Sequence, residues 1–198
     1  RELSRKWFCR YVQVRLPQPL VSFTFDDFPQ SAWRCGGAVM AHHGVHATYY
    51  VSMGLMDTVQ FGARQFALED VEALLAEGHE LGCHTYSHAK VGEVGLRRYE
   101  EDCARNADQA QRLLGHRFRN FSFPHGAAGP FYKRRLARHF RSLRGIGEGI
   151  NFGRVDLCRL LCNSLATGDT SHEEAPSPTT FGWTGWGCLK ISHFTNRL

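Results

Sequence analysis

The stretch LVSFTFDD, residues 20–27, decides the fold of this chain. Residues 20–25 are mostly apolar, β-branched or aromatic, and Pro19 precedes them, which predicts a buried strand. The two aspartates that follow, Asp26 and Asp27, repel each other unless a positive group lies beside them. A lone pair of aspartates is also common in turns and helix caps, so the pair alone leaves both interpretations open.

Segments of two kinds alternate after this first strand. Apolar stretches predict further strands at residues 47–51, 79–84, 120–123 and 142–145. Helices are predicted between them at residues 33–43, 68–77, 97–114 and 131–140, and several of these end at a glycine. Such alternation indicates βαβ units and a parallel sheet, and therefore an α/β fold that is either a barrel or doubly wound.

The composition is that of one ordinary globular domain. The 198 residues are 42% hydrophobic and 22% charged, so we expect a buried core and no disorder. No apolar stretch approaches the roughly 18 residues of a membrane span, so we expect none. The net charge of +5 is mild, and we interpret the arginines from Arg134 to Arg144 as a solvated helix face. We therefore expect no nucleic-acid partner.

Seven cysteines are scattered along the chain without a C-x-x-C pair. Their odd number and spacing indicate neither a disulfide framework nor a zinc ribbon. We interpret most of them as small buried side chains in a reducing compartment, which favours the cytoplasm. The chain opens with a charged run and without Met or an apolar signal-peptide region, so its start says little about its address.

A second polar cluster, His84-Thr85-Tyr86-Ser87-His88, follows another predicted strand. Parallel α/β folds place their sites at the carboxyl ends of strands, where this cluster and the twin aspartates both lie. Histidines at positions i and i+4 can point the same way on a turn of helix and suit one Zn²⁺ ion. Together with a carboxylate they supply a His₂Asp ligand set with open positions, which a hydrolytic metal site requires.

Three motifs resemble those of the NodB-like polysaccharide deacetylases. They are TFDD at residues 24–27, HTYSH at residues 84–88 and, in part, SFPHG at residues 122–126. The likeness covers residues 20–126 and extends more loosely to 165. It implies a distorted β/α barrel and a divalent metal, usually Zn²⁺, bound by Asp27, His84 and His88.

The resemblance also implies an activity and further roles. The family removes N-acetyl groups from N-acetylglucosamine-type polysaccharide with a metal-activated water. Asp26 would be the general base. The backbone N–H of His125, in a turn shaped by Pro124 and Gly126, would help to form an oxyanion hole. Alternatives on the same metal site are an acetyl esterase, a small-amide hydrolase or an inactive metal- or carbohydrate-binding domain.

Two positions depart from the family pattern. Phe28 stands where the family commonly has glycine, so it must adopt an allowed conformation or accept strain. Ser122 stands where the family has the arginine that orients the base. This change weakens the base unless another cation substitutes for that arginine.

The C-terminal part differs most. We expect residues 1–19 to be an N-terminal extension and residues 20–198 to be the deacetylase domain, atypical or shortened from about residue 166. The barrel would then be incomplete by roughly one α/β unit. The general-acid histidine has two candidates, His193 in an apolar-x-His segment and His172. Asp156 could tune that acid, although a turn or strand-start carboxylate is the more common case.

Overall fold

The computed structural model describes residues 8–60, 62–126, 128–165 and 189–195. One curled sheet organises them, with the strand order β11-β12-β2-β3-β6-β7-β8 and with β9 paired to β12. Its strands are β2 (Leu20–Phe25), β3 (Ala47–Val51), β6 (Glu80–Cys83), β7 (Asn120–Ser122), β8 (Ser142–Arg144), β9 (Ile150–Phe152), β11 (Asn163–Ser164) and β12 (Leu189–Thr195). Small antiparallel pairs join β1 (Tyr11–Gln13) to β10 (Arg154–Asp156) and β4 (Val59–Gln60) to β5 (Ala63–Arg64).

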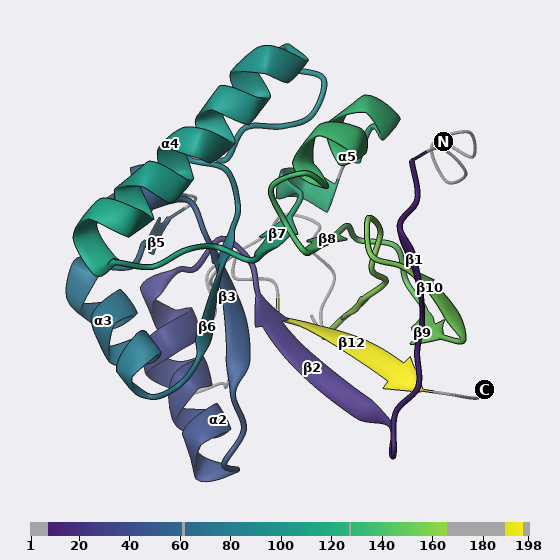
Figure 1. Cartoon of the computed structure of the whole chain (residues 1–198). Helices are drawn as coiled ribbons and strands as arrows, with labels where there is room; N and C mark the ends of the chain where they lie inside the picture. Colours follow the sequence, from purple (N-terminus) through teal and green to yellow (C-terminus); the bar gives the residue numbers. More distant parts are fainter. Residues whose placement is uncertain (1–7, 61, 127, 166–188, 196–198) are drawn as a thin grey trace.

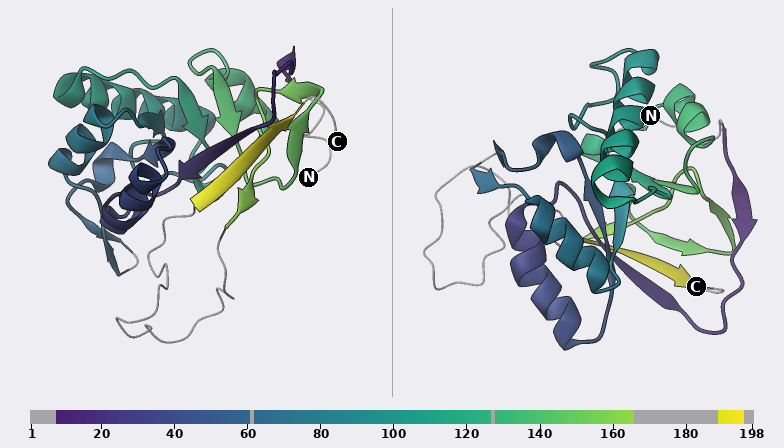
Figure 2. Two further views of the ribbon diagram at one scale, coloured as in Figure 1. Left: turned by 90° about the horizontal axis from the view of Figure 1, so that it is seen from below. Right: turned by 60° about the vertical axis from the view of Figure 1, so that its left-hand side comes forward.

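Strands β2, β3, β6, β7 and β8 run parallel, whereas β12 runs antiparallel to β2. Figure 1 shows β12 beside β2 on the side of the sheet away from helices α2 and α3, and Figure 2 shows the same arrangement from two further directions. Among the described residues the sheet does not close, apart from a single bridge between Arg144 and Leu160. The predicted α/β architecture, a distorted and incomplete barrel, is confirmed.

The helices cover the outer face of the sheet (Figure 1). They are α2 (Ala38–His42), α3 (Leu68–Ala76), α4 (Leu96–Leu114) and α5 (Pro130–Leu136), together with the π-helix η1 (Ala32–Gly37) and the 3₁₀ turns η2 (Met53–Leu55) and η3 (Pro124–Gly126). Helix α4 buries residues at spacings of three and four, Tyr99, Cys103, Asn106 and Ala110. It ends at Gly115, which has the left-handed φ of 62° that favours glycine at this position.

Two predicted helices differ from the structure. The predicted helix at residues 33–43 is instead the π-helix η1 followed by the short α-helix α2. Here the Trp33 ring lies against Gly37, where a Cβ would come within 2.5 Å of the ring. The predicted helix at residues 131–140 ends at Leu136, because the chain then turns and buries Phe140 against Phe121, with ring centroids 5.2 Å apart.

The strands separate an apolar face from a polar one, as their twofold side-chain alternation requires. One face supplies the core beneath the helices, with Phe25, Tyr49, Leu81, Phe121 and Leu143 fully buried. The other face lines a cavity of about 130 Å³ inside the curl of the sheet. Its polar lining includes Thr24, Thr48, Glu80, Asn120, Ser142 and Arg144.

Hydrogen bonds satisfy much of this polar lining. The carboxylate of Glu80 accepts from Thr48 Oγ1 at 2.9 Å and from Asn120 Nδ2 at 2.7 Å. Ser142 Oγ in turn donates to Asn120 Oδ1 at 2.8 Å. The network links four neighbouring strands, so it stabilises a polar interior that would otherwise be unfavourable.

Arg144 corrects the expectation of a solvated arginine face. It is the last residue of β8, not part of a helix, and its exposed fraction is 1%. The expectation was wrong at this position because Arg144 lies in a strand, and β8 turns its side chain into the interior.

Most of the described cysteines are small buried side chains, as expected. Cys83, Cys103, Cys158 and Cys162 are buried and free, whereas Cys9 is half-buried and Cys35 is exposed. Within the described part of the chain, no helix combines the length and apolarity that crossing a bilayer requires.

Candidate metal centre

The parallel strands bring three of the sequence motifs to one edge of the sheet. Asp26 and Asp27 follow β2, His84 follows β6, and the turn at Pro124 follows β7. Strand β3 lies between β2 and β6, so the residues after these two strands face each other across its carboxyl end. The fold therefore gathers residues that are far apart in the sequence.

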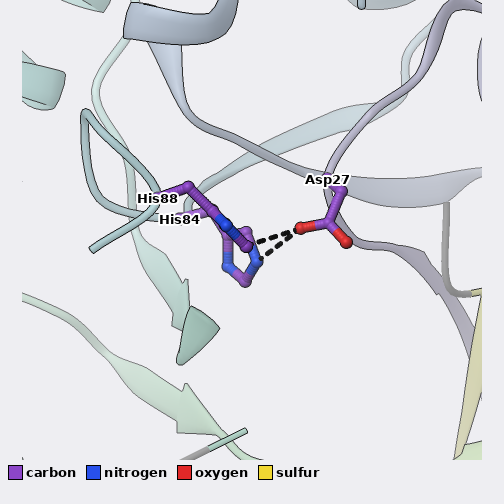
Figure 3. Close-up of side chains that lie close together, drawn as sticks. All are labelled: Asp27, His84 and His88. Carbon is purple, nitrogen blue, oxygen red and sulfur yellow. Dashed lines mark ion pairs between the residues drawn. The ribbon is translucent and has the colours of Figure 1, made fainter. Parts of the chain in front are cut away.

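Asp27, His84 and His88 form a compact cluster. Oδ1 of Asp27 lies 2.8 Å from Nε2 of His88 and 3.2 Å from Nε2 of His84. Figure 3 shows the two imidazole rings side by side, both facing this one carboxylate oxygen. The three potential ligand atoms lie within 4.8 Å of one another, as coordination to a single ion requires.

The segment from His84 to His88 is a bent loop, not the turn of helix that its spacing suggested. Thr85 and His88 have left-handed φ values of 62° and 58°. The carboxylate of Asp102, on α4, accepts hydrogen bonds from the N–H groups of Tyr86 and Ser87 at 2.9 and 3.0 Å. These bonds hold the strained loop in the conformation that turns both rings toward Asp27.

The ring of His84 is fixed by its second nitrogen. Nδ1 lies 2.8 Å from the backbone carbonyl oxygen of Ser122, which can only accept, so Nδ1 carries the hydrogen. Nε2 is then left with a lone pair that points toward Asp27. A backbone carbonyl that fixes the tautomer in this way is the usual support of a histidine ligand.

These residues fit a divalent cation. Oδ1 of Asp27 and Nε2 of His88 are buried atoms that lack any partner with hydrogen-bond geometry among the described residues. Burial would raise the pKa of Asp27, but the adjacent imidazoles of His84 and His88 outweigh it and hold that pKa below its usual range. A carboxylate and two imidazole lone pairs that converge on one point form a donor set that suits Zn²⁺.

Phe28 adopts a strained backbone conformation, with φ at 36°, and Asp27 before it has φ at 62°. For a residue other than glycine this region costs about 1–2 kcal/mol. The side chain of Phe28 is fully buried and stacks on Phe66, with ring centroids 4.9 Å apart. Burying a phenylalanine contributes about 1.5–3 kcal/mol, so this packing can offset the strain.

Arg144 is a polar neighbour of the site that the sequence analysis missed. Its Nη2 forms an ion pair with Oδ1 of Asp26 and donates to Ser122 Oγ at 2.8 Å. Burial would lower the pKa of Arg144, but the charge of Asp26 outweighs it and raises that pKa. Its position at the carboxyl end of a predicted strand was the signal that could have identified it.

The third motif forms the turn η3 beside the cluster. His125 has a φ of 55°, and its ring centroid lies 4.7 Å from that of His88. Gly126 has a φ of 65°, which favours glycine, and a Cβ there would meet the side chain of Ile146, which would have to move. Pro124 is buried beneath the turn. The structure therefore places this predicted turn at the mouth of the site.

The structure does not bring His193 to the carboxylates. Its partner in the antiparallel pairing of β12 with β2 is Val21, near the start of β2, whereas Asp26 and Asp27 follow the other end of that strand. Nδ1 of His193 faces Asn163 Nδ2 at 3.5 Å. We therefore do not retain His193 as a general acid. The other candidate, His172, lies outside the described residues.

The carboxylate of Asp156 is held by an ion pair and by backbone hydrogen bonds. It accepts from the buried Lys133 at 3.3 Å and from the backbone N–H groups of Arg10 and Cys158, each at 2.9 Å. These contacts tie the N-terminal segment and α5 to the end of β10, where Asp156 is the last residue.

Comparisons with known proteins agree with the motifs. The family model described as Polysaccharide deacetylase matches residues 13–143, which is more than half of the chain. A search of curated proteins finds no match.

Several solved structures share the fold. IcaB from Ammonifex degensii is 24% identical with a TM-score of 0.58, and the match covers 63% of this chain and 58% of that one. The deacetylase PplD from Streptococcus pyogenes, solved with acetate, is 17% identical with a TM-score of 0.61, covering 70% of this chain and 61% of that one. The BpsB deacetylase domain from Bordetella bronchiseptica is 14% identical with a TM-score of 0.58. The match covers 70% of this chain and 68% of that one.

The match thus spans about three-fifths of the first two of these structures. At these identities the likeness to solved structures establishes the fold, and the family model together with the three motifs establishes the relationship. The chain belongs to the polysaccharide deacetylase family.

Proposed function

We propose that this chain is a metal-dependent hydrolase that removes N-acetyl groups from polysaccharide of the N-acetylglucosamine type. The observation that carries the proposal is the convergence of Asp27, His84 and His88 on one point, with Asp26 next to them in the sequence. Membership of the polysaccharide deacetylase family supports both the reaction and the substrate class.

Asp27, His84 and His88 would hold the cation, for which we propose Zn²⁺. Bound there, the cation would act as a Lewis acid: it would polarise the scissile carbonyl and lower the pKa of the attacking water. His84 is suited to this role because the carbonyl of Ser122 leaves its Nε2 free of hydrogen. The carboxylate of Asp27 supplies the negative charge that a divalent ion requires.

Asp26 would accept the proton of the attacking water as general base. A positioned general base contributes roughly 10²–10⁴-fold to a rate. Asp26 is buried, with an exposed fraction of 6%, and it does not belong to the three-residue metal cluster, so its carboxylate remains for proton transfer.

The turn of Pro124, His125 and Gly126 would lie against the carbonyl oxygen of the substrate. A backbone N–H at this turn, that of His125, would stabilise the negative charge that develops there. We further propose that His172 protonates the leaving amine, since β12 carries His193 to the other end of β2.

The proposal is tested by zinc analysis together with acetate release from chito-oligosaccharides, for the wild type and for Asp26→Asn. Asp108→Asn, on the exposed face of α4, is the matched control for loss of one carboxylate. We expect one zinc per chain in all three proteins, and acetate release that only Asp26→Asn loses, by about 10²-fold or more.

Other outcomes separate the alternatives. Release from acetylated xylan but not from chito-oligosaccharides would indicate an esterase. Zinc without acetate release in the wild type would indicate a binding domain. A wild-type protein that binds no divalent metal would contradict the deacetylase, the esterase and the metal-binding hypotheses alike.

A further inference from the structure

Arg144 has an unusual position for a buried arginine. It ends β8, yet its guanidinium reaches the carboxylate of Asp26, which follows β2. Strands β3, β6 and β7 lie between β2 and β8 in the sheet, so this contact crosses the curl instead of passing between neighbouring strands. The guanidinium of Arg144 is buried and paired with a carboxylate at the carboxyl edge of the sheet, where the site lies. Charged groups in such positions are often functional.

The guanidinium is held from several sides. Nη1 donates to the carbonyl oxygen of Gly145 at 3.0 Å and faces Sγ of Cys162 at 3.5 Å. Nη2 donates to Ser122 Oγ at 2.8 Å while it contacts Asp26. The guanidinium carbon lies over the ring of Tyr50, 4.9 Å from the ring centroid. These contacts fix the direction from which the guanidinium approaches Asp26.

The contact distinguishes the two oxygens of Asp26. Arg144 pairs with Oδ1. Oδ2 has no hydrogen-bond partner among the described residues, so it is the oxygen left to accept a proton. Holding a general base in one orientation matters, because a displacement of about 1 Å can lower a rate by roughly 10²-fold.

Ser122 and Arg144 are direct partners in the parallel pairing of β7 with β8. An arginine at position 122 would therefore start about 4.8 Å away, on the next strand, at the same level of the sheet. Ser122 Oγ instead accepts a hydrogen bond from Arg144, so the small residue leaves room for the guanidinium that comes from β8.

We propose that Arg144 is the positioning residue of Asp26: it fixes Oδ1 so that Oδ2 faces the reacting water, and it does so from β8 across Ser122. The proposal rests on the proposed function, because it assigns a partner to the general base. Arg144 acts through Asp26 and touches neither the substrate nor the cation.

The structure supplies a way to separate positioning from mere stability. Arg144 lines the cavity of about 130 Å³ within the sheet, and its Nε lacks a hydrogen-bond partner there among the described residues. Removing the side chain would enlarge this cavity beside Asp26, so free guanidinium ion could enter and take the place of the side chain.

The experiment measures zinc content, kcat and KM for acetate release with the wild type, Arg144→Ser, and Arg144→Ser with millimolar guanidinium chloride. The double variant S122R/R144S returns the arginine from the neighbouring strand. Arg141→Ser, an exposed arginine three residues earlier, is the matched control. Because removing one partner of a buried ion pair can prevent folding, Arg144→Lys serves as a second variant that keeps the charge.

We expect Arg144→Ser to retain zinc and to lose roughly 10–10²-fold in kcat, with KM changed by less than about twofold. Guanidinium or the returned arginine should recover most of this loss and bring kcat to within about threefold of the wild-type value. Arg144→Lys, which keeps the charge but not the fork geometry, should fall between the wild type and Arg144→Ser. Arg141→Ser should match the wild type.

Two results would overturn the proposal while leaving the proposed function intact. One is an Arg144→Ser protein that binds zinc and keeps the wild-type kcat. The other is a loss of kcat that neither guanidinium nor the S122R/R144S exchange reverses, which would assign Arg144 a structural role alone. A wild-type protein without acetate release would instead overturn the proposed function, and this role with it.

Discussion

His84 and Ser122 are joined by a hydrogen bond of 2.8 Å between the ring nitrogen Nδ1 and the backbone carbonyl oxygen. The bond links the loop after β6 to the end of β7, so the sheet itself determines which nitrogen of His84 faces Asp27. Since a backbone carbonyl cannot be removed by substitution, this part of the site is insensitive to the side chain at position 122.

A pH dependence of zinc binding follows from this arrangement. Burial alone would lower the pKa of His84, but the contact with Asp27 and the charges of both aspartates outweigh it and raise that pKa. A proton on Nε2 therefore competes with the cation, and the competition grows as the pH falls. We expect the apparent Kd for zinc to rise by up to about tenfold per pH unit below the pKa of His84.

Competition with a zinc chelator of known affinity at a series of pH values between about 5.5 and 8 checks this expectation. The chelator's own pH dependence is corrected with a protein-free series. A zinc affinity that stays constant over this range would show that His84 Nε2 is not a ligand.

Phe28 permits a test of backbone strain. At a φ of 36°, glycine is free of the penalty that any side chain meets. We expect Phe28→Ala and Phe28→Gly both to be less stable than the wild type, because each removes the fully buried ring that stacks on Phe66. Phe28→Gly should nevertheless be the more stable of the two by about 1 kcal/mol, the reverse of their usual order.

Urea unfolding of the three proteins gives the free energies of unfolding. The matched pair is Phe66→Ala and Phe66→Gly, because Phe66 is equally buried but is not among the residues with positive φ. There alanine should be the better replacement. An alanine variant that is more stable than the glycine variant at position 28 as well would refute the account of strain.

Asp156 gives a test of the boundary between stability and catalysis. Asp156→Asn leaves the buried Lys133, with an exposed fraction of 1%, without its charge partner. Breaking a buried pair in this way typically destabilises a protein by about 3–5 kcal/mol. We expect a lower Tm but an unchanged kcat and zinc content in the folded protein.

The measurement is thermal unfolding followed by acetate release at a temperature well below the new Tm. Glu93→Gln, which breaks an exposed pair with Lys90, is the control and should change Tm little. A kcat that falls although the folded fraction is unchanged would show that Asp156 acts on the reaction after all.

The local pattern predicted much of the fold. Strand β3 has the predicted bounds, because Ala47–Val51 is a run of five residues that are all buried between two neighbouring strands. Helix α4 ends where Gly115 was expected to end it. The approach of Asp27, His84 and His88 was also predictable, since parallel strands present their carboxyl ends at one edge.

Long-range geometry accounts for what the sequence left open. The segment with His193 matched an apolar-x-His pattern, but a pattern determines neither the direction nor the register of a strand, and β12 pairs antiparallel with β2. Arg144 was taken for a solvated arginine because its partner Asp26 is 118 positions away in the chain. The position of Arg144 at the end of a predicted strand marked it as a neighbour of the site, but nothing in the nearby sequence indicates that Asp26 is its partner.

The central claim, that one cation is bound by Asp27, His84 and His88, is tested most directly by titrating metal-free protein with Zn²⁺ in a calorimeter. The wild type and Asp26→Asn should each bind one zinc ion per chain with similar affinity. Asp27→Asn, which changes the adjacent carboxylate, should bind at least about tenfold more weakly. Equal zinc affinity in the two asparagine variants, or no binding by the wild type, would contradict the account.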